Sequence, residues 1–109
     1  MPKISNISFE VSEAVKALGA HIRIARVRRR LRQEALAEKC GISRKTLYGI
    51  EKGLPGSAIG NIYTVLWALG LLDSTRSVAE PDMDEHGKIL EAAKLPKRIR
   101  ESFDIDNDF

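Results

Sequence analysis

Cationic side chains are the residues of this sequence with the most evident chemistry, and they gather in one segment. Residues 16–52 hold eleven Lys or Arg and three acids, a net charge of +8 in a chain of 109 residues whose total is +3. Residues 73–91 and 101–109 each carry −4, and residues 94–100 carry +4. This distribution favours a polyanionic partner for the first half and an appended interaction segment after it; a solvated charged surface is the alternative.

The sequence lacks the groups that catalysis or metal binding requires. His21 and His86 are isolated and Cys40 is the single thiol, so neither a nucleophile–His–acid set nor a metal-ligand spacing is present. No glycine-rich loop of the phosphate-cradling type occurs either. We therefore predict that the chain is not an enzyme and uses no cofactor and no metal. Cys40 is expected to be a packed thiol rather than a redox sensor.

Length and apolar content indicate the class of protein. A chain of 109 residues suits one compact domain with a tail. Its apolar runs fall far short of the ~20 residues of a membrane-spanning helix. The first residues, 1–6, have no signal-peptide core. We expect a cytoplasmic protein with no membrane partner.

The first helix is predicted from Ser12, as its N-cap, to about Arg30. Its apolar residues recur at intervals of three and four, as one buried face requires. They are Val11, Val15, Leu18, Ile22 and Ala25. Ahead of this helix, residues 1–11 alternate apolar and polar side chains around Phe9, which fits a short strand; a flexible arm is the alternative.

Residues 33–52 predict two short helices joined by a tight turn. Gly41 can adopt the left-handed conformation that ends a helix, and Ser43 is a good N-cap for the next one. Ala37 is small, as the crossing point of two steeply inclined helices requires. Leu47 provides part of the inward face of the second helix. This arrangement is a helix, a glycine turn and a helix.

The rest of the chain reads as further helices and a tail. A fourth helix is predicted from Ile59 to Leu69, with Gly70 ending it, and residues 71–78 form a short fifth helix or a dimer contact. The predicted dimer interface as a whole is residues 69–78. Pro81 can begin another helix, which Leu95-Pro96 ends. From its spacing we predict that its inner face consists of Met83, Leu90 and Ala93. Trp67 is predicted as a core or dimer contact.

The predicted fold is therefore all-α. It is a compact bundle of about five helices with a C-terminal helical extension and an acidic tail. The predicted organisation is an arm or strand at 1–11, a helical domain at 12–78, an extension at 79–100 and a tail at 101–109.

Residues 18–72 resemble the lambda-repressor/Cro-type helix-turn-helix family, also called the XRE family. The match runs in register through turn, small and apolar positions over about half of the chain. It includes Leu18-Gly19, Ile22, Arg26, Gln33 to Leu47, Ile50 to Gly53 and Ala68 to Leu71. Two positions depart from the family pattern: Arg32 stands where a capping residue is usual, and Gly49 lacks the side chain common at late recognition positions.

The resemblance implies a sequence-specific transcriptional regulator that binds double-stranded DNA as a homodimer on a palindromic operator. Such a protein would be associated with the nucleoid when bound. The second helix of the pair lies in the major groove, so its exposed side chains are the predicted base readers. They are Ser43, Arg44, Lys45, Thr46 and Tyr48. Arg44 and Lys45 can bind the acceptor atoms of guanine. Thr46 could instead contact a thymine methyl group or a phosphate.

The same resemblance implies contacts to the DNA backbone and a structural ion pair. The free N–H groups at the start of the first helix of the pair also suit a phosphate. The predicted phosphate contacts are Gln33, Arg32, Arg29, Arg23, Lys52 and Asn61. Arg26 and Glu51 match a pair that forms an internal salt bridge in parts of the family, so both are predicted to be structural, like Ala37 and Gly41.

A second, shorter resemblance lies beyond the helical domain. Residues 81–87 and 95–98 are similar to the extensions of HipB-like proteins, the regulator partners of HipA-type kinase toxins. This similarity implies an autoregulating antitoxin; a stand-alone dimeric repressor is the alternative. The tail interleaves three apolar anchors, Phe103, Ile105 and Phe109, with acids. We predict that they bind a partner; a tail that folds back on the basic domain, or that only aids solubility, is the alternative.

Overall fold

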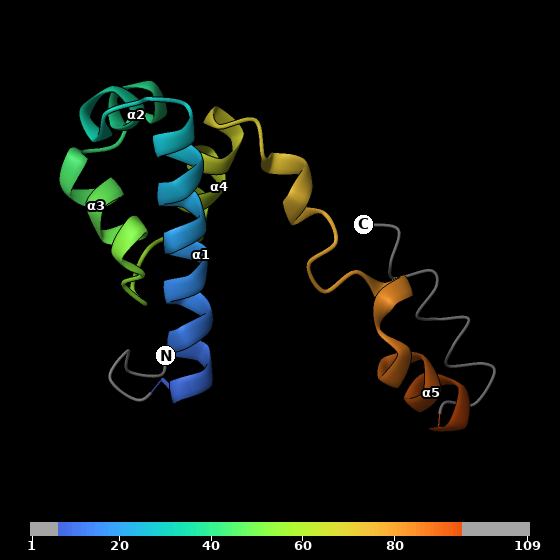
Figure 1. Ribbon diagram of the computed structural model, residues 1–109. Helices are drawn as coiled ribbons and strands as arrows, with labels where there is room; N and C mark the ends of the chain where they lie inside the picture. The colour runs from blue at the N-terminus through green and yellow to red at the C-terminus, as the bar shows by residue number, and fades with distance from the viewer. Residues whose placement is uncertain (1–6, 95–109) are drawn as a thin grey trace. The chain divides into compact units, whose positions relative to one another are not determined.

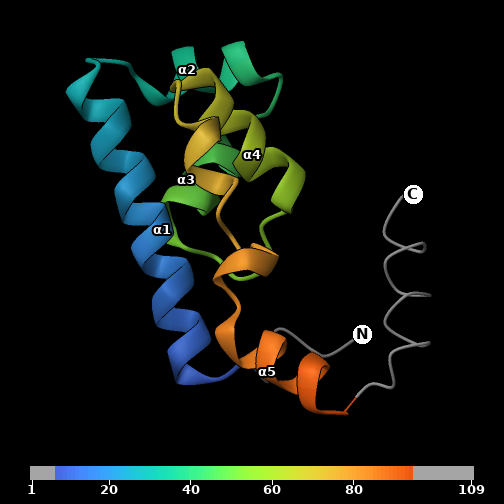
Figure 2. The same cartoon turned by 90° about the vertical axis from the view of Figure 1, so that its right-hand side faces the viewer.

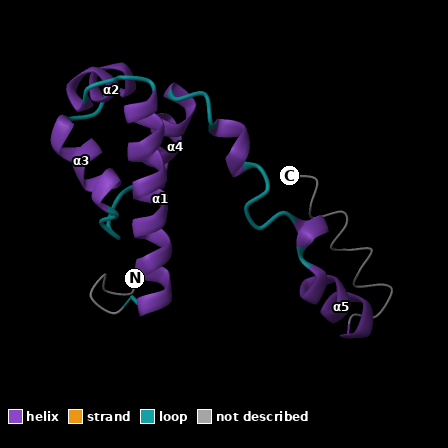
Figure 3. Ribbon diagram, in the orientation of Figure 1, coloured by secondary structure: helices purple, strands orange, loops and turns teal. Residues whose placement is uncertain are grey.

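The computed structural model describes residues 7–94, and every regular element within that range is helical (Figures 1 and 3). The α-helices are α1 (Phe9–Arg28), α2 (Gln33–Cys40), α3 (Arg44–Lys52), α4 (Ile59–Ala68) and α5 (Glu85–Lys94). Two short 3-10 helices cover Leu72–Thr75 and Pro81–Met83. The predicted all-α fold is confirmed. The chain forms two compact units, with the boundary between Thr75 and Arg76.

Helix α1 begins earlier than the sequence pattern predicts. Ser8 is the N-cap, and its Oγ accepts a hydrogen bond from the Val11 N–H at 3.2 Å. Glu10 stands in the first turn, where a carboxylate suits the positive end of the helix dipole. The prediction of Ser12 as cap was therefore wrong. The predicted strand or arm is also wrong for residues 9–11, because a capped first turn outweighs three alternating apolar residues.

The turn between α2 and α3 is built as predicted. Gly41 caps α2 with φ 70°, and the Ile42 N–H donates to the Ala37 carbonyl at 3.0 Å, so the chain reverses within two residues. Ser43 then caps α3 by accepting from the Thr46 N–H at 3.0 Å. Arg32 occupies the cap position of α2 without a side-chain hydrogen bond to that helix. Figures 1 and 2 show α2 crossing the end of α1, with α3 alongside α1.

The core of the first unit lies among α1, α2, α3 and α4. Its completely buried large side chains are Ile22, Leu36, Leu47 and Val65. The remaining core residues are Ala25, Ala37, Ile50, Leu66 and Leu69. Each large aliphatic side chain contributes about 1.5–3 kcal/mol by leaving water, so one residue from each helix supplies the main packing energy.

The predicted inner face of α1 is only partly buried. Val11 is 50 % exposed and Leu18 is 38 % exposed, whereas Ile22 and Ala25 lie in the core. The first turns of α1 therefore do not take part in the core that its later turns form. Spacing alone identified the correct stripe on the helix but not how far along the helix the packing extends.

Two glycines let α1 and α3 meet at backbone distance. A Cβ atom on Gly19 would lie 2.7 Å from the Glu51 carbonyl oxygen and 2.9 Å from the Gly53 nitrogen. A Cβ on Gly53, whose φ is 75°, would lie 2.9 Å from the Lys16 nitrogen. Real Cβ atoms do not approach backbone so closely, so side chains at these positions would push the two helices apart.

The end of the first unit differs in detail from the prediction. Helix α4 ends at Ala68, close to the predicted position, and Leu72–Thr75 is a single 3-10 turn in place of a fifth helix. Leu69 belongs to the core, so it is not available for the dimer contact predicted at residues 69–78. Trp67 is 59 % exposed, which excludes its core role.

The second unit, described up to Lys94, contains the Pro81–Met83 turn and α5. Pro81 begins the 3-10 turn, whereas the α-helix begins at Glu85, directly after Asp84, whose Oδ1 accepts from the Gly87 N–H at 2.9 Å. The predicted inner face was wrong, because Met83 is 71 % and Leu90 is 39 % exposed, and Ala93 is exposed as well. The predicted end of this helix at Leu95–Pro96 and the predicted anchors Phe103, Ile105 and Phe109 lie outside the described residues.

Candidate nucleic-acid interface

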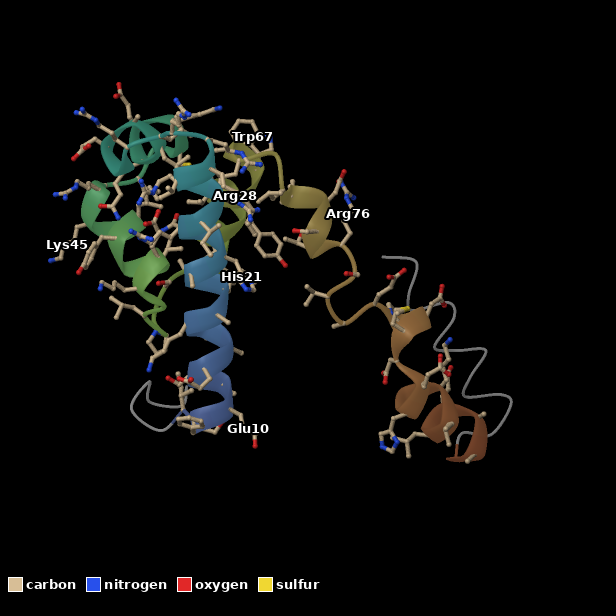
Figure 4. The ribbon with its side chains drawn as sticks, viewed as in Figure 1. Glu10, His21, Arg28, Lys45, Trp67 and Arg76 are labelled. Carbon is tan, nitrogen blue, oxygen red and sulfur yellow. The ribbon has the colours of Figure 1, made fainter. Side chains whose placement is uncertain are left out.

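Helix α3 presents two chemically different faces. Leu47 and Ile50 are buried against the other helices, whereas Arg44, Lys45 and Tyr48 are exposed. These three exposed side chains line one hollow of about 300 Å³ on the outside of the helix. Figure 4 shows Lys45 extending from α3 away from the bundle. The structure thus brings together three of the five predicted base readers.

Glu34 on α2 holds the first residue of α3. The Arg44 Nε lies 3.2 Å from Glu34 Oε1, and both side chains are 64 % exposed. An ion pair this exposed stabilises the fold by only about 0.2–1 kcal/mol. The pair places an acidic side chain of α2 beside the cation that begins α3. Sequence analysis did not identify Glu34, since a pair ten residues apart across a turn leaves no periodic signal.

The side chain of Lys52 contacts the Tyr48 ring. The Lys52 Nζ lies 5.5 Å from the centre of the Tyr48 ring, within the range of a cation–π contact. These residues are four apart on α3 and therefore neighbours on its surface. Lys52, predicted as a phosphate contact, thus lies beside a predicted base reader.

Ser43 and Thr46 are committed to the helix cap. The Ser43 hydroxyl donates to Thr46 Oγ1 at 2.8 Å and accepts from the Thr46 N–H. Each hydroxyl oxygen keeps a lone pair for a further partner. Their direct role in the structure is to begin α3 at Arg44, and their predicted contacts to bases stay predictions.

A buried network joins α1, α2 and α3 behind this surface. Arg26 forms two parallel bonds with Glu51, from Nε to Oε2 at 2.7 Å and from Nη2 to Oε1 at 3.0 Å. Arg26 Nη1 also donates to the Leu31 carbonyl at 2.8 Å. The predicted structural pair is thereby present, and its two-pronged geometry is the strongest form of such a bond.

Gln33 is attached to the same network. Its Nε2 donates to Glu51 Oε1 at 3.1 Å, which fixes the side chain at the first position of α2. An amide nitrogen carries two hydrogens, so one remains for a phosphate oxygen. Because Arg32 leaves the start of α2 without a side-chain cap, the backbone N–H groups there are also available to an anion.

The other predicted phosphate contacts are spread over the first unit. Arg29 Nη1 donates to the Ala25 carbonyl of its own helix at 2.8 Å, so in this structure that side chain is folded back. Arg23 on α1 and Arg32 ahead of α2 are exposed. Asn61 is half-buried in the first turn of α4. Among them, Arg32 lies next to Gln33 at the start of α2.

Cys40 packs at the end of α2. The thiol is half-buried against the core and lies 3.9 Å from the Thr64 carbonyl oxygen, which its hydrogen can reach. Burial raises the pKa of the Cys40 thiol, and the nearby Lys39 ammonium offsets only part of that rise. A group whose thiolate form is disfavoured is a poor nucleophile at neutral pH.

Cys40 is accordingly expected to react slowly with iodoacetamide. Its pH profile of alkylation should be displaced to higher pH than that of the same chain unfolded in urea, because the folded thiol ionises later. Mass spectrometry of timed samples measures both profiles. A folded protein alkylated as fast at pH 7 as the unfolded chain would contradict the packed-thiol assignment.

Within residues 7–94, no group of three or more His, Cys, Asp or Glu side chains is arranged to hold a metal ion. No helix in that range combines the length and the apolar character that crossing a membrane demands.

Comparison with known proteins yields one match. Residues 17–59 match the family model described as a helix-turn-helix domain, a span that runs from within α1 to the first residue of α4. No curated protein and no solved structure shows a significant match to the chain. The matched span contains the glycine turn, the capped α3 and the buried Arg26–Glu51 pair. Residues 17–59 are therefore similar in sequence to a helix-turn-helix domain, and α2, the Gly41 turn and α3 have the arrangement which that name describes.

Proposed function

We propose that this chain is a transcriptional regulator that binds double-stranded DNA in a sequence-specific manner. The observation that carries the proposal is the outward face of α3, where Arg44, Lys45 and Tyr48 are exposed while the opposite face is held in the core. Base edges in the major groove are recognised by such side chains on a rigid helix. A regulator of this kind acts at the chromosome, so we also propose a cytoplasmic, nucleoid-associated protein.

The dimensions of the domain suit this role. Helix α3 has nine residues and is therefore about 14 Å long, and an α-helix fits the ~12 Å width of the major groove. The Arg44 guanidinium can bridge O6 and N7 of guanine, and Lys45 can reach the same acceptors. Gln33 and the N–H groups at the start of α2 would then hold a phosphate and set the position of α3 along the groove.

Two variants separate base reading from backbone binding. Arg44→Ala should weaken binding to the preferred operator by about 1–3 kcal/mol and relax the preference at one base position. Lys52→Ala should weaken binding to every duplex to a similar extent and make the affinity less dependent on salt by about one released counterion. Anisotropy titrations at three salt concentrations, on an operator selected from a random library and on a scrambled duplex, measure both.

The contrast between the two variants is the test. The proposal is wrong if the unmodified chain binds selected and scrambled duplexes equally, or if both variants behave like the unmodified chain. Lys88→Ala in the second unit serves as the control for loss of one exposed cation, since it lies outside the helix-turn-helix domain.

A regulator on a palindromic site acts as a homodimer, and α4 offers a surface for it. Helix α4 contains no charged residue, and Ile59 and Trp67 on it are 67 % and 59 % exposed. With Tyr63 between them, they stand four residues apart and share one face. An exposed uncharged face that includes an aromatic residue is typical of a surface that binds protein. The proposed occupant is the same face of a second copy, because two-fold symmetry pairs like with like.

Trp67→Glu should weaken self-association by about tenfold or more, as expected for loss of a large interface anchor together with a buried carboxylate. Sedimentation velocity without DNA, over a range of protein concentrations, measures the change. Ile24→Glu is the matched control, because it adds the same charge at an apolar position of α1 that is 44 % exposed. An unchanged dimer in Trp67→Glu and a lost dimer in Ile24→Glu would place the contact on α1 instead.

We further propose that the protein is the HipB-like regulator of a HipA-type kinase toxin operon. The support is the similarity of residues 81–87 and 95–98 to HipB-like extensions and the character of the second unit. Within its described part, Met83 and Ile89 are 71 % and 64 % exposed on short helical elements. Apolar side chains that find no core in their own unit suit a protein partner.

Affinity purification from the native host tests this proposal. A stoichiometric kinase-like protein encoded beside this gene, recovered with the full chain, is the expected result. A version ending at Arg100 should lose the kinase if Phe103, Ile105 and Phe109 bind it, and should keep it if the second unit alone is sufficient. Recovery of this chain by itself would favour a stand-alone dimeric repressor.

A further inference from the structure

We propose that the hollow between Arg44, Lys45 and Tyr48 reads the C5-methyl group of a pyrimidine next to a guanine. The inference rests on the proposed DNA-binding function and extends it to the chemistry of the bases that are recognised. The predicted operator half-site thus contains a guanine, bridged by Arg44, and a methyl-bearing pyrimidine that packs on the Tyr48 ring.

Only a few side chains of α3 are available to contact bases. The Ser43 and Thr46 hydroxyls are bonded to one another in the cap, and Leu47 and Ile50 point into the core. Gly49 has no side chain, and a Cβ there would lie 3.1 Å from Leu54. The first two turns of the outward face therefore offer two cations, Arg44 and Lys45, and one ring, and Lys52 follows in the last turn beside that ring.

The Tyr48 ring is the apolar part of this face. Tyr48 is 49 % exposed, and Lys52 lies over the ring at 5.5 Å from its centre. This exposed contact favours one position of the ring without fixing it, and the half-exposed ring itself offers an apolar surface to the groove. In the major groove the apolar feature of the bases is the methyl group on C5 of thymine. A 5-methylcytosine carries the same methyl group at the same place.

Arg44 is the side chain that would bind the neighbouring guanine. The Arg44 Nε lies 3.2 Å from Glu34 Oε1 in an exposed ion pair, and a guanidinium with five N–H donors can bridge O6 and N7 of guanine as well. Arg44 and Tyr48 are four residues apart, so their Cβ atoms stand about 6 Å from one another. Base pairs rise by about 3.4 Å, so the guanine and the methyl-bearing pyrimidine lie one or two base pairs apart. Glu34 is a positioning residue in this arrangement.

The test removes one methyl group at a time. An operator is first selected from a random duplex library with the unmodified full-length chain. Each thymine of a half-site is then replaced by deoxyuridine, which deletes only the methyl group. At one position, within two base pairs of a guanine, we expect about a fourfold loss of affinity per half-site, the effect of one buried methyl. At the remaining positions the affinity should be unchanged.

The variants assign the effect to the ring. Tyr48→Ala should bind thymine and deoxyuridine duplexes with equal affinity, whereas Tyr48→Phe, which keeps the ring, should retain the discrimination. Because Tyr48 faces outward, the Tyr48→Ala chain should stay folded, and circular dichroism verifies that. Glu34→Gln should weaken discrimination for the guanine while leaving the thymine-to-deoxyuridine ratio intact.

A last arm identifies the source of the methyl group. The sensitive thymine is replaced by cytosine and by 5-methylcytosine, each paired with guanine. Tighter binding to 5-methylcytosine than to thymine would indicate recognition of methylated DNA, and the reverse an ordinary operator base. If the unmodified chain binds its operator specifically but no thymine is sensitive to loss of the methyl group, this inference fails and the proposed function stands. If specific binding is absent altogether, both fail.

Discussion

Replacement of Glu51 by Ala is expected to lower the free energy of unfolding by about 3–5 kcal/mol, because it leaves a buried guanidinium without its partner. Arg26 is 9 % exposed and gives two of its hydrogen bonds to Glu51. With the carboxylate gone, water cannot easily replace it, and the positive charge is stranded between α1 and α3. Urea unfolding followed by circular dichroism measures the change.

The matched control removes both charges. A chain with Arg26→Met and Glu51→Leu should regain most of the stability, since an apolar pair of similar volume avoids the cost of burying charge. It should still bind DNA less well than the unmodified chain, because Gln33 has lost the carboxylate that holds it at 3.1 Å. If the double variant were as unstable as Glu51→Ala alone, the buried charge would not be the cause of the instability.

Gly19→Ala is expected to lower the free energy of unfolding by about 3 kcal/mol, the upper end of the usual cost of overpacking. The added methyl group would meet the Glu51 carbonyl oxygen at 2.7 Å and the Gly53 nitrogen at 2.9 Å, and neither backbone atom can rotate away. The last turn of α3 must therefore move away from α1. We expect DNA affinity to fall with the stability, because α3 is the helix that we propose to read the bases.

Gly60→Ala is the control for the intrinsic preference of alanine for helices. Nothing lies within 4 Å of a Cβ at Gly60 in α4, so this change should stabilise the protein by up to about 1 kcal/mol. Thermal melts of both variants, with titrations of the selected operator, test the contrast. Equal stability of the two variants would mean that α1 and α3 are not in backbone contact in solution.

Local signals carried the most information in the sequence. The turn at Gly41, the cap at Ser43 and the end of α4 near Gly70 depend on residues a few positions apart, and all three are present as predicted. The start of α1 was misplaced by four residues because Ser8 and Ser12 are both acceptable caps, and the choice between them depends on the hydrogen bond that Ser8 makes.

Contacts between distant parts of the chain were much less accessible. The close approach at Gly19 and the pairing of Glu34 with Arg44 require the crossing of helices to be known. Gln33 was predicted only as a phosphate contact, but in the structure it also donates a hydrogen bond to Glu51. The inner face predicted for a helix beginning at Pro81 was wrong for a related reason: its spacing was helical, but Met83 in the 3-10 turn and Leu90 on α5 are both exposed.

The division of α3 into a buried and an exposed face also bears on how such a protein can diversify. Leu47, Ile50 and Glu51 secure the helix, while Arg44, Lys45 and Tyr48 contribute nothing to the core. If these three residues read the bases as proposed, exchanging them should change the DNA sequence that the domain prefers at little cost in stability. Duplicated copies of the gene could in this way give two regulators in one cell, neither of which binds the operator of the other.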